Sequence, residues 1–417
     1  MTELLPVREA QDKILEIFQL RQPEVCKVEL AYHRILAENI TSPIALPPFN
    51  NSSMDGYAVR SEETRDASPA SPVTLPVSLD IPAGYTQQGV LAKGTTARIL
   101  TGAPIPEGAD AVIPVEDTDQ YKRPQTGPMQ FTVSFFKSAK PGDNLRRAGE
   151  DVQLGQLVLE RGRRLQPQDI GLLVSLGICE VKINQKARIA LFSSGDELLL
   201  PGEHMSPGKI YDSNTYVLTG LFEDAGAEVT HLGIAKDNPE SVKNTLDQAL
   251  KNPPDLIVSS AGVSVGAFDY VREVIEANGR LSFWRVNMRP GKPVAFGNYK
   301  NIPFIGLPGN PVSAYIGAQV FVLPIIRKMS GLAHLDQRCM QVTLLDPLES
   351  PDGRESYFRG VIKKEDGIYK ASLTGHQGSG NLFSLVKANC LLVVPAGVKR
   401  IAAGDTINAW VLDTELD

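Results

Sequence analysis

The spacing of apolar residues along the chain predicts where its first helices lie. Within residues 4–20, Ala10 and Ile14 fall four positions apart and therefore share one face of a helix. Residues 167–178 repeat this spacing and begin with a proline, which is favoured in a first helical turn. Between these helices, residues 43–140 carry short apolar runs broken by proline and glycine. This texture is typical of a small β-rich domain inserted between two segments that form one domain.

From residue 187 the pattern changes to alternating strands and helices. Strands are predicted at ARIALF, VTHLGI and DLIVSS, and helices at 214–225, from Pro239 onward and at 270–278. Alternating units of this size need crossover connections, so we expect a largely parallel sheet covered on both faces. Ligands of such sheets bind at the carboxyl ends of the strands. After Gly331 the chain returns to strand-like runs, which predict a C-terminal β domain.

One apolar stretch is long enough to cross a bilayer. Residues 304–326 contain no charged residue. Pro308, Pro311 and Pro324 interrupt the stretch. The segment GLPGNP indicates a turn, with Asn310 as the N-cap and Pro311 at the first helical position. We therefore favour a buried strand, turn and helix over a membrane span.

Composition and charge exclude several classes of protein. The 417 residues are 42% hydrophobic and 22% charged, which is typical of a globular protein of two to four domains. A net charge of −6 gives no general attraction to nucleic acid or an anionic membrane, so an anionic ligand must be held locally. Four separated cysteines without a CxxC pair and five scattered histidines predict no His/Cys metal cluster. Without a signal-peptide pattern, we expect a reduced, cytoplasmic protein.

Two segments after predicted strands carry candidate chemistry. Residues 193–197 (SSGDE) supply backbone N–H groups for an anion and carboxylates for a divalent cation, although a helix-capping turn explains them equally well. Residues 259–270 (SSAGVSVGAFDY) suit phosphate or pterin recognition but match neither the Walker A nor the dinucleotide motif. Asp269 stands where an N-cap belongs, and Asp237 lies beside another helix start, so capping roles remain open for both.

Three further turns could bind charged ligands. Residues 289–293 (RPGKP) hold two cations on a turn stiffened by proline, which favours oxyanion binding over a solvated hairpin. Residues 50–60 and 101–117 in the β-rich insert, and 146–152 just beyond it, join carboxylates or hydroxyls to tight turns. For Asp55, the alternative is a simple hairpin turn with the glycine that follows.

In this order, the motifs resemble those of the molybdopterin molybdenumtransferase family, the bacterial MoeA type that also includes the C-terminal domain of gephyrin. The matching motifs are SSMDGYAVR, TGAPIPEGADAVIPVED, GEDV, SSGDEL with PGKIYDSN, GVSVGAFDY, RPGKP and GLPGNPVSA. They extend from about residue 47 to 315, and the terminal segments fit the family across nearly the whole chain.

The resemblance implies a multidomain α/β plus β fold in four parts. These are a discontinuous α+β first domain (1–43 and 139–183), an inserted β-rich domain (44–138), a doubly wound, mostly parallel α/β molybdopterin-binding domain (184–331) and a C-terminal β-barrel-like domain (332–417). It also implies a homodimer, with each active site between the α/β domain of one subunit and the inserted domain of the other.

The resemblance further implies an Mg²⁺-dependent transferase of molybdenum cofactor biosynthesis. Such an enzyme inserts molybdenum from molybdate into adenylylated molybdopterin and releases AMP. Expected partners are the molybdopterin adenylyltransferase and acceptor molybdoenzymes, with no nucleic acid and no membrane. One alternative is a non-catalytic molybdopterin-binding carrier or scaffold on the same fold; another is an unrelated phosphate-ester hydrolase, since a fold alone does not determine chemistry.

Site residues follow from matching positions in the family motifs. The implied catalytic carboxylates are Asp55, Asp151, Glu197 and Asp269, of which the first three would also hold the metal. The implied substrate-binding residues are Thr101, Ser193, Ser194, Gly195, Asp237, Ser259, Ser260, Gly262, Ser264, Gly266, Pro308 and Asn310. The implied molybdate residues are Arg289, Lys292, Pro293, Arg359 and Ser379.

Two residues depart from the family pattern. Ala261 stands where the family usually has glycine, so its Cβ would crowd the ligand or strain a backbone that needs positive φ. Arg289 replaces the commoner lysine, which keeps the charge but changes its geometry. We expect molybdate binding to survive the second change.

Overall fold

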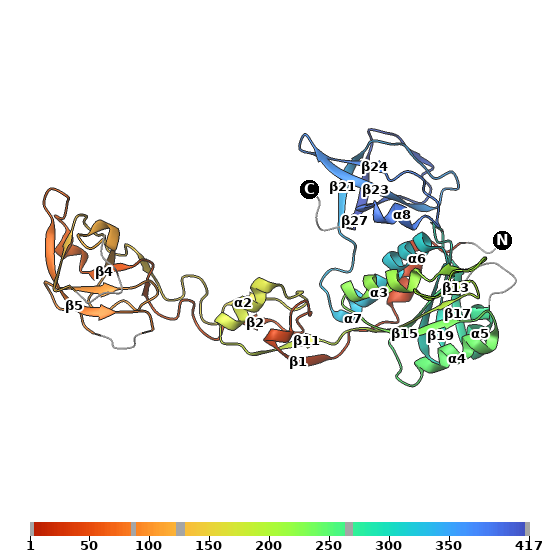
Figure 1. Ribbon diagram of the computed structural model, residues 1–417, viewed down its shortest axis with the longest axis horizontal. Coiled ribbons are helices and arrows are strands. Elements are labelled where there is room, and N and C mark those ends of the chain that lie inside the picture. The colour runs from red at the N-terminus through yellow and green to blue at the C-terminus, as the bar shows by residue number, and fades with distance from the viewer. Residues whose placement is uncertain (1–3, 85–88, 122–129, 263–269, 413–417) are drawn as a thin grey trace. The chain divides into compact units, whose positions relative to one another are not determined.

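The computed structural model of the chain describes residues 4–84, 89–121, 130–262 and 270–412. Figure 1 shows the chain with its elements labelled. The chain divides into two compact units. The first comprises Met1–Glu38, Arg161–Gln166 and Glu180–Asp417, and the second comprises Asn39–Glu160 and Pro167–Cys179. The chain therefore enters and leaves the second unit within the first, as an insertion requires. The finer boundaries between four domains remain predictions.

A six-stranded sheet lies at the centre of the first unit. In pairing order its strands are β15 (Glu228–Ala235), β12 (Arg188–Ser194), β16 (Leu256–Ser260), β20 (Ile302–Leu307), β19 (Pro293–Tyr299) and β17 (Gly279–Arg285). The first four pair in parallel, and β19 and β17 add an antiparallel edge. The largely parallel sheet is confirmed.

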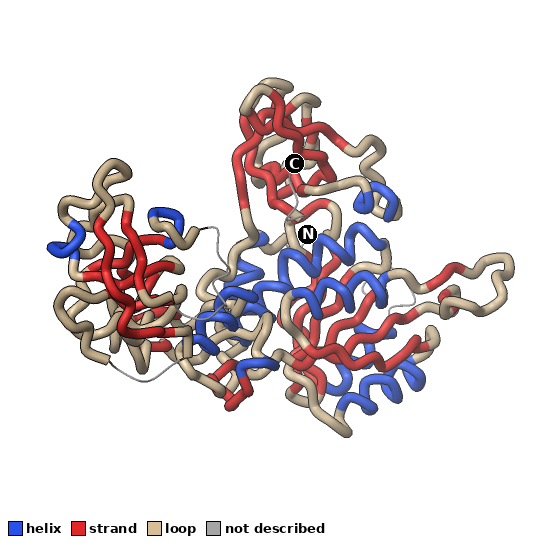
Figure 2. Tube along the Cα trace, turned by 60° about the vertical axis from the view of Figure 1, so that its left-hand side comes forward, coloured by secondary structure: helices blue, strands red, loops and turns tan. Residues whose placement is uncertain are grey.

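Helices cover both faces of this sheet (Figure 2). One face carries α1 (Val7–Leu15), α3 (Asn214–Asp224), α6 (Pro311–Gly317), the π-helical segment η4 (Ala318–Val322) and α7 (Leu323–Ser330). The other carries α4 (Pro239–Ala249) and α5 (Tyr270–Asn278). Two apolar cores, one on each face, fix the helices to the sheet and hold its carboxyl edge in place.

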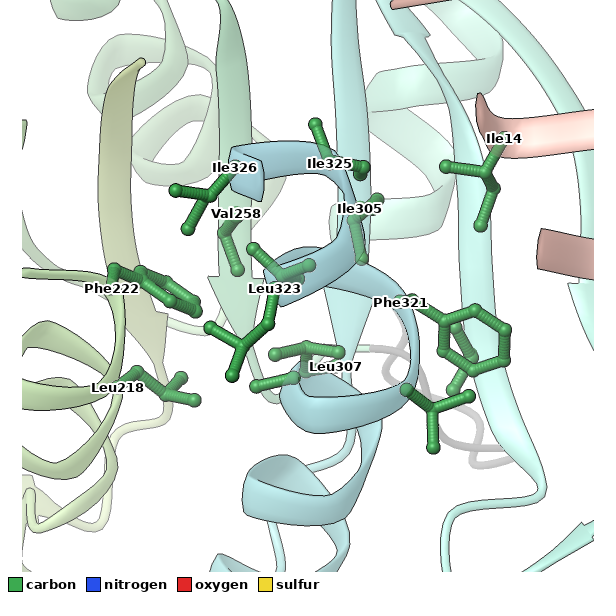
Figure 3. Packing of buried hydrophobic residues seen from close by; sticks show 14 of the residues in the cluster. Ile14, Leu218, Phe222, Val258, Ile305, Leu307, Phe321, Leu323, Ile325 and Ile326 are labelled. Atoms are coloured by element: carbon green, nitrogen blue, oxygen red, sulfur yellow. The ribbon is translucent and has the colours of Figure 1, made fainter. Parts of the chain in front are cut away.

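The apolar segment weighed as a membrane span forms the core of one face. Pro311–Ser330 is a helical stretch of 20 residues, apolar enough to cross a membrane, and 83% of an 18-residue window within it is buried in the fold. Phe321 and Leu323 belong to the same packed cluster as Leu307 of β20 and Phe222 of α3 (Figure 3). This burial is that of a core helix, as the interrupting prolines predict.

The start of α6 differs from the prediction in one contact. Pro311 occupies the first turn and Asn310 precedes it, as expected. However, the Asn310 side chain makes no capping hydrogen bond, and its Nδ2 instead donates to Ser379 Oγ at 3.0 Å. Asn310 is therefore the N-cap residue by position, as predicted, but its side chain contacts Ser379 and does not accept a hydrogen bond from an α6 N–H group.

The C-terminal segment forms a closed five-stranded barrel. Its strands are β21 (Cys339–Leu344), β23 (Glu355–Glu365), β24 (Ile368–Leu373), β25 (Cys390–Val394) and β27 (Thr406–Val411). Pairing of β23 with β25 closes the barrel, which confirms the predicted barrel-like domain. The short strand β18 (Met288–Arg289) pairs in parallel with β23, so the RPGKP turn lies against the barrel. A short helix, α8 (Leu382–Val386), was not predicted.

The second unit is built on a five-stranded sheet. In pairing order its strands are β7 (Ala111–Pro114), β4 (Gly56–Val59), β6 (Thr96–Ile99), β5 (Val73–Ile81) and β8 (Thr132–Phe135). A Cβ at Gly56 would lie 2.1 Å from the Ile113 carbonyl oxygen, so only glycine permits this approach of β4 to β7. Helix α2 (Pro167–Ser175) also belongs to this unit.

The remaining elements are short strands and 3₁₀ helices. They are β1 (Pro23–Lys27), η1 (Val28–Leu30), β2 (Ile40–Thr41), β3 (Asn51–Ser52), η2 (Ser61–Thr64), η3 (Val115–Asp117), β9 (Leu145–Arg146), β10 (Leu157–Leu159), β11 (Glu180–Asn184), β13 (Leu198–Leu199), β14 (Ile210–Tyr211), β22 (Leu348–Glu349) and β26 (Arg400–Ile401).

Candidate functional site

A cavity of about 530 Å³ lies at the carboxyl ends of β12 and β16. Many of the predicted substrate-binding residues line it. Those that do are Ser193, Ser260, Gly262, Pro308 and Asn310, and the predicted catalytic residue Glu197 and molybdate residue Pro293 line it as well. The position agrees with the rule that ligands of parallel sheets bind beyond the strand ends.

The SSGDE turn is held by the carboxylate of Asp237. Asp237 Oδ1 accepts a hydrogen bond from Ser194 Oγ at 3.2 Å, and its Oδ2 accepts one from the Asp196 backbone N–H at 3.2 Å. The N-cap of α4 is instead Asn238, whose side chain accepts from the Ser241 N–H at 2.8 Å. The capping role left open for Asp237 is therefore filled by its neighbour, and Asp237 shapes the turn.

Glu197 lies beside the cavity with its carboxylate folded over a glycine. A Cβ at Gly195 would lie 2.5 Å from Glu197 Oε2, so a larger residue there would displace the carboxylate. Strand β13 (Leu198–Leu199) follows the turn directly, so the helix-capping interpretation of SSGDE is wrong. No hydrogen bond or ion pair engages this carboxylate within the described part of the chain.

The loop after β16 begins with two residues of positive φ, directly after the buried hydroxyls of Ser259 and Ser260. Ala261 has φ of +75° and Gly262 has φ of +73°, so both occupy the left-handed region. Ser259 is buried, and its Oγ donates to the Ala261 carbonyl oxygen at 3.4 Å. The strain expected at Ala261 is therefore present in its backbone. Three predicted residues of this loop, Ser264, Gly266 and Asp269, lie outside the described residues.

Asn214, at the start of α3, was not singled out individually from the sequence. Its Nδ2 donates to Ser260 Oγ and to the Gly309 carbonyl oxygen, each at 2.7 Å. Its Oδ1 is buried and lacks a partner within the described structure. Asn214 thus joins the end of β16 to the GLPGNP turn and leaves one buried acceptor beside the cavity. The PGKIYDSN motif, which contains this residue, was the only signal for it in the sequence.

A second cavity of about 390 Å³ adjoins the first and shares Pro293, Pro308 and Asn310 with it. The predicted molybdate residues all line this cavity. They are Arg289, Lys292, Pro293, Arg359 and Ser379. The RPGKP turn therefore contacts the barrel across a cationic cavity and is not a solvated hairpin.

Arg359 places a buried positive charge at this second cavity. The residue is only 1% exposed, and burial lowers its pKa to about 10, so it remains protonated at neutral pH. Its Nε donates to Ser384 Oγ and its Nη2 to the Gly378 carbonyl oxygen, both at 3.0 Å. No carboxylate pairs with it within the described ranges. A buried charge without a counter-ion is costly, so this cavity is suited to an anion.

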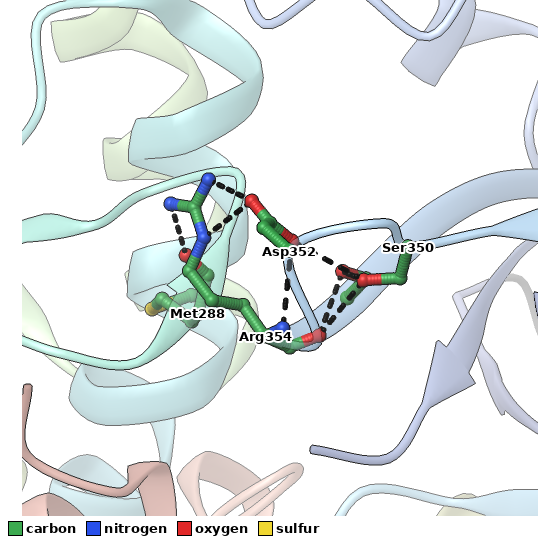
Figure 4. A network of polar contacts seen from close by, with 5 residues as sticks. Met288, Ser350, Asp352 and Arg354 are labelled. Carbon is green, nitrogen blue, oxygen red and sulfur yellow. Dashed lines mark hydrogen bonds and ion pairs between the residues drawn. The ribbon is translucent and has the colours of Figure 1, made fainter. Parts of the chain in front are cut away.

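A further arginine at this cavity was missed from the sequence. Arg354 lines the cavity, and its Nη1 donates to the Met288 carbonyl oxygen at 3.3 Å (Figure 4). Its Nε donates to Asp352 Oδ2 at 2.7 Å. Although burial acts to raise the pKa of Asp352, hydrogen bonds from Arg354 and the charge of Arg289 lower it overall. Arg354 thus ties the strand before the RPGKP turn to the barrel.

The other predicted carboxylates belong to the second unit. Asp55 Oδ1 accepts from the Thr101 N–H at 2.6 Å and from Thr101 Oγ1 at 2.7 Å. Asp151 Oδ2 accepts from Arg146 Nη2 at 2.5 Å. The strands on either side of Asp55, β3 and β4, pair in different sheets, so the hairpin-turn interpretation is wrong. Within the described residues, no three His, Cys, Asp or Glu side chains converge as a metal cluster.

These features define a class: a multidomain protein whose α/β domain and C-terminal barrel together line a cationic cavity. Three family descriptions match successive parts of the chain. They are the MoeA N-terminal region (domain I and II) at residues 5–177, a probable molybdopterin binding domain at 190–328 and the MoeA C-terminal region (domain IV) at 341–412.

Full-length relatives agree with these matches. A protein of Mycobacterium tuberculosis named molybdopterin molybdenumtransferase 2 is 37% identical over 412 residues, covering 97% of this chain and 99% of the relative. The molybdopterin molybdenumtransferase of Haemophilus influenzae is 37% identical over 408 residues, covering 97% of this chain and 98% of the relative. The chain belongs to the molybdopterin molybdenumtransferase family, as its motifs predicted.

A solved structure supports the fold independently. The molybdopterin biosynthesis moea protein from Pyrococcus horikosii superimposes with a TM-score of 0.80 at 31% identity, covering 99% of this chain and 100% of that one. The predicted fold class, with its parallel α/β domain, β-rich insert and C-terminal barrel, is therefore confirmed.

Proposed function

We propose that the chain is a molybdopterin molybdenumtransferase, which inserts molybdenum from molybdate into adenylylated molybdopterin and releases AMP. The observation that carries this proposal is the buried guanidinium of Arg359, which has no carboxylate partner among the described residues, at a cavity that Arg289 and Lys292 also line. Three cations at one cavity attract an oxyanion, and arginine binds such groups through paired N–H donors. Family membership supplies molybdate as that oxyanion.

The first cavity is our proposed site for the pterin substrate. The buried Oδ1 of Asn214 offers an acceptor that a pterin N–H group would satisfy. Ser193 and Ser260 add hydroxyls, and the Gly262 backbone permits close approach of a phosphate. Because Pro293 and Pro308 line both cavities, a pterin in the first would hold its sulfur atoms next to an oxyanion in the second. Such positioning is a principal source of catalysis.

We further propose that Mg²⁺ accompanies the adenylylated substrate. Mg²⁺ is usually held by one or two carboxylates together with phosphate oxygens, and not by a protein-only cage. The carboxylate of Glu197, which no described residue engages, fits this role, with Asp55 and Asp151 as further oxygen donors. When bound, Mg²⁺ would neutralise phosphate charge as AMP leaves.

The proposed assembly is a cytoplasmic homodimer. We propose that Asp55, Thr101 and Asp151 of one subunit complete the site formed by Glu197 and Arg359 of the other. The molybdopterin adenylyltransferase would supply the substrate, and molybdoenzymes would accept the product.

Anaerobic incubation with adenylylated molybdopterin, Mg²⁺ and molybdate tests the function. We expect AMP release and reconstitution of a cofactor-free molybdoenzyme by the wild type. Lys292→Gln should abolish molybdate-dependent AMP release, since it removes one of the cations of the oxyanion cavity. Lys363→Gln is the matched control, because Lys363 lies exposed on the same strand as Arg359, away from the cavity.

Two outcomes would contradict the proposal. If the pterin binds but neither AMP nor active cofactor forms, the chain is a carrier or scaffold. If simple phosphate esters are hydrolysed without molybdopterin, the site is that of an unrelated hydrolase.

A further inference from the structure

A third cavity of about 410 Å³ shares no lining residue with the two cavities of the candidate site. It lies among α3, the helical stretch 311–330 and the ends of two barrel strands. Its volume falls in the range of small-molecule sites. The proposed reaction leaves this cavity without a role.

Three guanidinium groups line the cavity, and none forms an ion pair with a carboxylate that the structure describes. Arg164, Arg327 and Arg338 all contribute to its wall. None of them takes part in an ion pair with a described carboxylate. Burial lowers the pKa of Arg327; Asp336 acts to raise it, and the like charge of Arg164 acts to lower it. Cations gathered in this way are stabilised by an anion between them.

Packing accounts for Arg327 but not for the other two arginines. Arg327 Nη1 donates to the Leu335 carbonyl oxygen and its Nη2 to Gln337 Oε1, both at 2.9 Å, which anchors the segment after α7. Arg164 Nη2 donates to the Asp224 carbonyl oxygen at 2.6 Å, while its Nε is buried without a described partner. The Arg338 side chain is exposed and makes no described contact. Two guanidinium groups therefore retain donors for a ligand.

Three polar side chains of the cavity wall, Tyr315, Gln319 and Gln337, are linked by hydrogen bonds. Gln319 is 5% exposed; its Nε2 donates to Tyr315 Oη at 3.1 Å, and its Oε1 accepts from Gln337 Nε2. Gln319 belongs to the π-helical segment η4, and such segments are frequent at functional sites. The remaining wall includes the apolar side chains of Leu221 and Leu323 and the exposed residue Asp224, so the lining carries three cations and one carboxylate. The lining thus offers cations, hydrogen bonds and an apolar surface together.

We propose that this third cavity binds a small organic oxyanion, a phosphate or carboxylate carried on an apolar or aromatic body. The anionic group lies between Arg164 and Arg338, and the body packs on the leucines of α3 and α7. Because Arg338 immediately precedes β21 and Val411 ends β27, the ligand also links the barrel to the helices. The proposal is independent of the proposed transferase reaction.

Isothermal titration of the full-length protein with phenyl phosphate, benzoate and inorganic phosphate tests this site. We expect one equivalent of phenyl phosphate or benzoate to bind per chain, more tightly than inorganic phosphate, because only these two carry an apolar body. Arg164→Gln and Arg338→Gln should each weaken binding about tenfold, the effect of losing one charged hydrogen bond. Because the Arg338 side chain is exposed, Arg338→Gln should not impair folding.

Two controls separate this site from other anion binding. Lys292→Gln removes a cation of the candidate active site and should leave the binding that depends on Arg164 and Arg338 unchanged. Arg8→Gln removes a guanidinium that is 77% exposed on α1 and should also leave it unchanged. Absence of binding, loss of binding in Lys292→Gln, equal weakening by Arg8→Gln, or equal affinity for inorganic phosphate would each overturn the proposal. Whichever probe binds more tightly identifies the ligand as a phosphate or a carboxylate.

Discussion

At the scale of single residues, Ala261 adopts a backbone conformation that a residue with a Cβ disfavours. Its φ of +75° is a conformation that costs a residue with a Cβ about 1 kcal/mol or more. The methyl group faces the GLPGNP turn, because a Cβ built on Gly309 would lie 3.1 Å from Ala261 Cβ. Both features place the strain at the edge of the first cavity, where strained backbone often accompanies a binding site.

Replacing Ala261 with glycine should raise the free energy of unfolding by about 1 kcal/mol, because glycine adopts positive φ without strain. Urea unfolding followed by the fluorescence of Trp284, which lies in β17 of the same sheet, measures this change. The matched control is Ala277→Gly in α5, where helical backbone makes glycine destabilising by about 1 kcal/mol. Destabilisation by both substitutions would contradict the argument.

Asp247 is a second residue whose environment differs from that of an ordinary surface carboxylate. Its Oδ1 accepts from Tyr299 Oη at 2.6 Å and from Lys300 Nζ at 2.7 Å, and its Oδ2 lies 2.5 Å from Lys243 Nζ. Burial acts to raise the pKa of Asp247, but these hydrogen bonds lower it well below its ordinary value. The ionised carboxylate therefore stabilises the junction of α4 with β19.

We expect Asp247→Asn to lower the free energy of unfolding at pH 7 by about 1 kcal/mol. Because the folded-state pKa lies below the unfolded value, the stabilisation is complete above about pH 4 and is lost as the pH falls toward the folded value. The difference between wild type and variant should therefore shrink below about pH 4. Urea titrations at several pH values measure it, with Asp66→Asn at an exposed position as control. A difference independent of pH would refute the charge-based explanation.

At the scale of elements, the pairing of β18 with β23 assembles the oxyanion cavity. Met288 pairs with Glu355 and Arg289 with Ser356, which aligns the RPGKP turn with the barrel strand that carries Arg359. Arg354 reinforces this pairing through its hydrogen bond to the Met288 carbonyl oxygen. The geometry of the cavity thus depends on two elements that lie far apart in the sequence.

Arg354→Gln should raise the molybdate concentration needed for half-maximal AMP release about tenfold, with a smaller effect on the maximal rate. The reason is that Arg354 supplies charge at the cavity and fixes the turn that carries Arg289. Molybdate titrations of the proposed reaction measure this, and Arg400→Gln, exposed on β26, is the control. A lower maximal rate at unchanged molybdate dependence would argue against a role in oxyanion binding.

At the scale of the whole molecule, the proposed active site needs residues from two subunits. Mixing Asp55→Asn with Lys292→Gln subunits should then restore about a quarter of wild-type activity, since half the dimers are mixed and each holds one intact site. Arg289→Gln mixed with Lys292→Gln is the matched control and should restore none, because both changes affect the same cavity. Confirmed mixed dimers without recovered activity would exclude a site shared between subunits.

Much of the fold could be predicted from local sequence patterns. Helical spacing identified 214–225 and 270–278, which the structure has as Asn214–Asp224 and Tyr270–Asn278. These patterns were sufficient because a helix or buried strand is encoded by neighbouring residues. The first helix was predicted too long, at 4–20 against Val7–Leu15, since apolar spacing continues past the point where the helix ends.

The sequence by itself determined the order of elements, the glycine and proline turns and the motifs that define the family. Only the tertiary structure decided that Arg359 is buried and that Arg354 holds the RPGKP turn. It also decided that Asn214 joins the loop after β16 to the GLPGNP turn. The physical reason is that charge burial and cavity shape depend on contacts between residues far apart in the chain. No local pattern records those contacts.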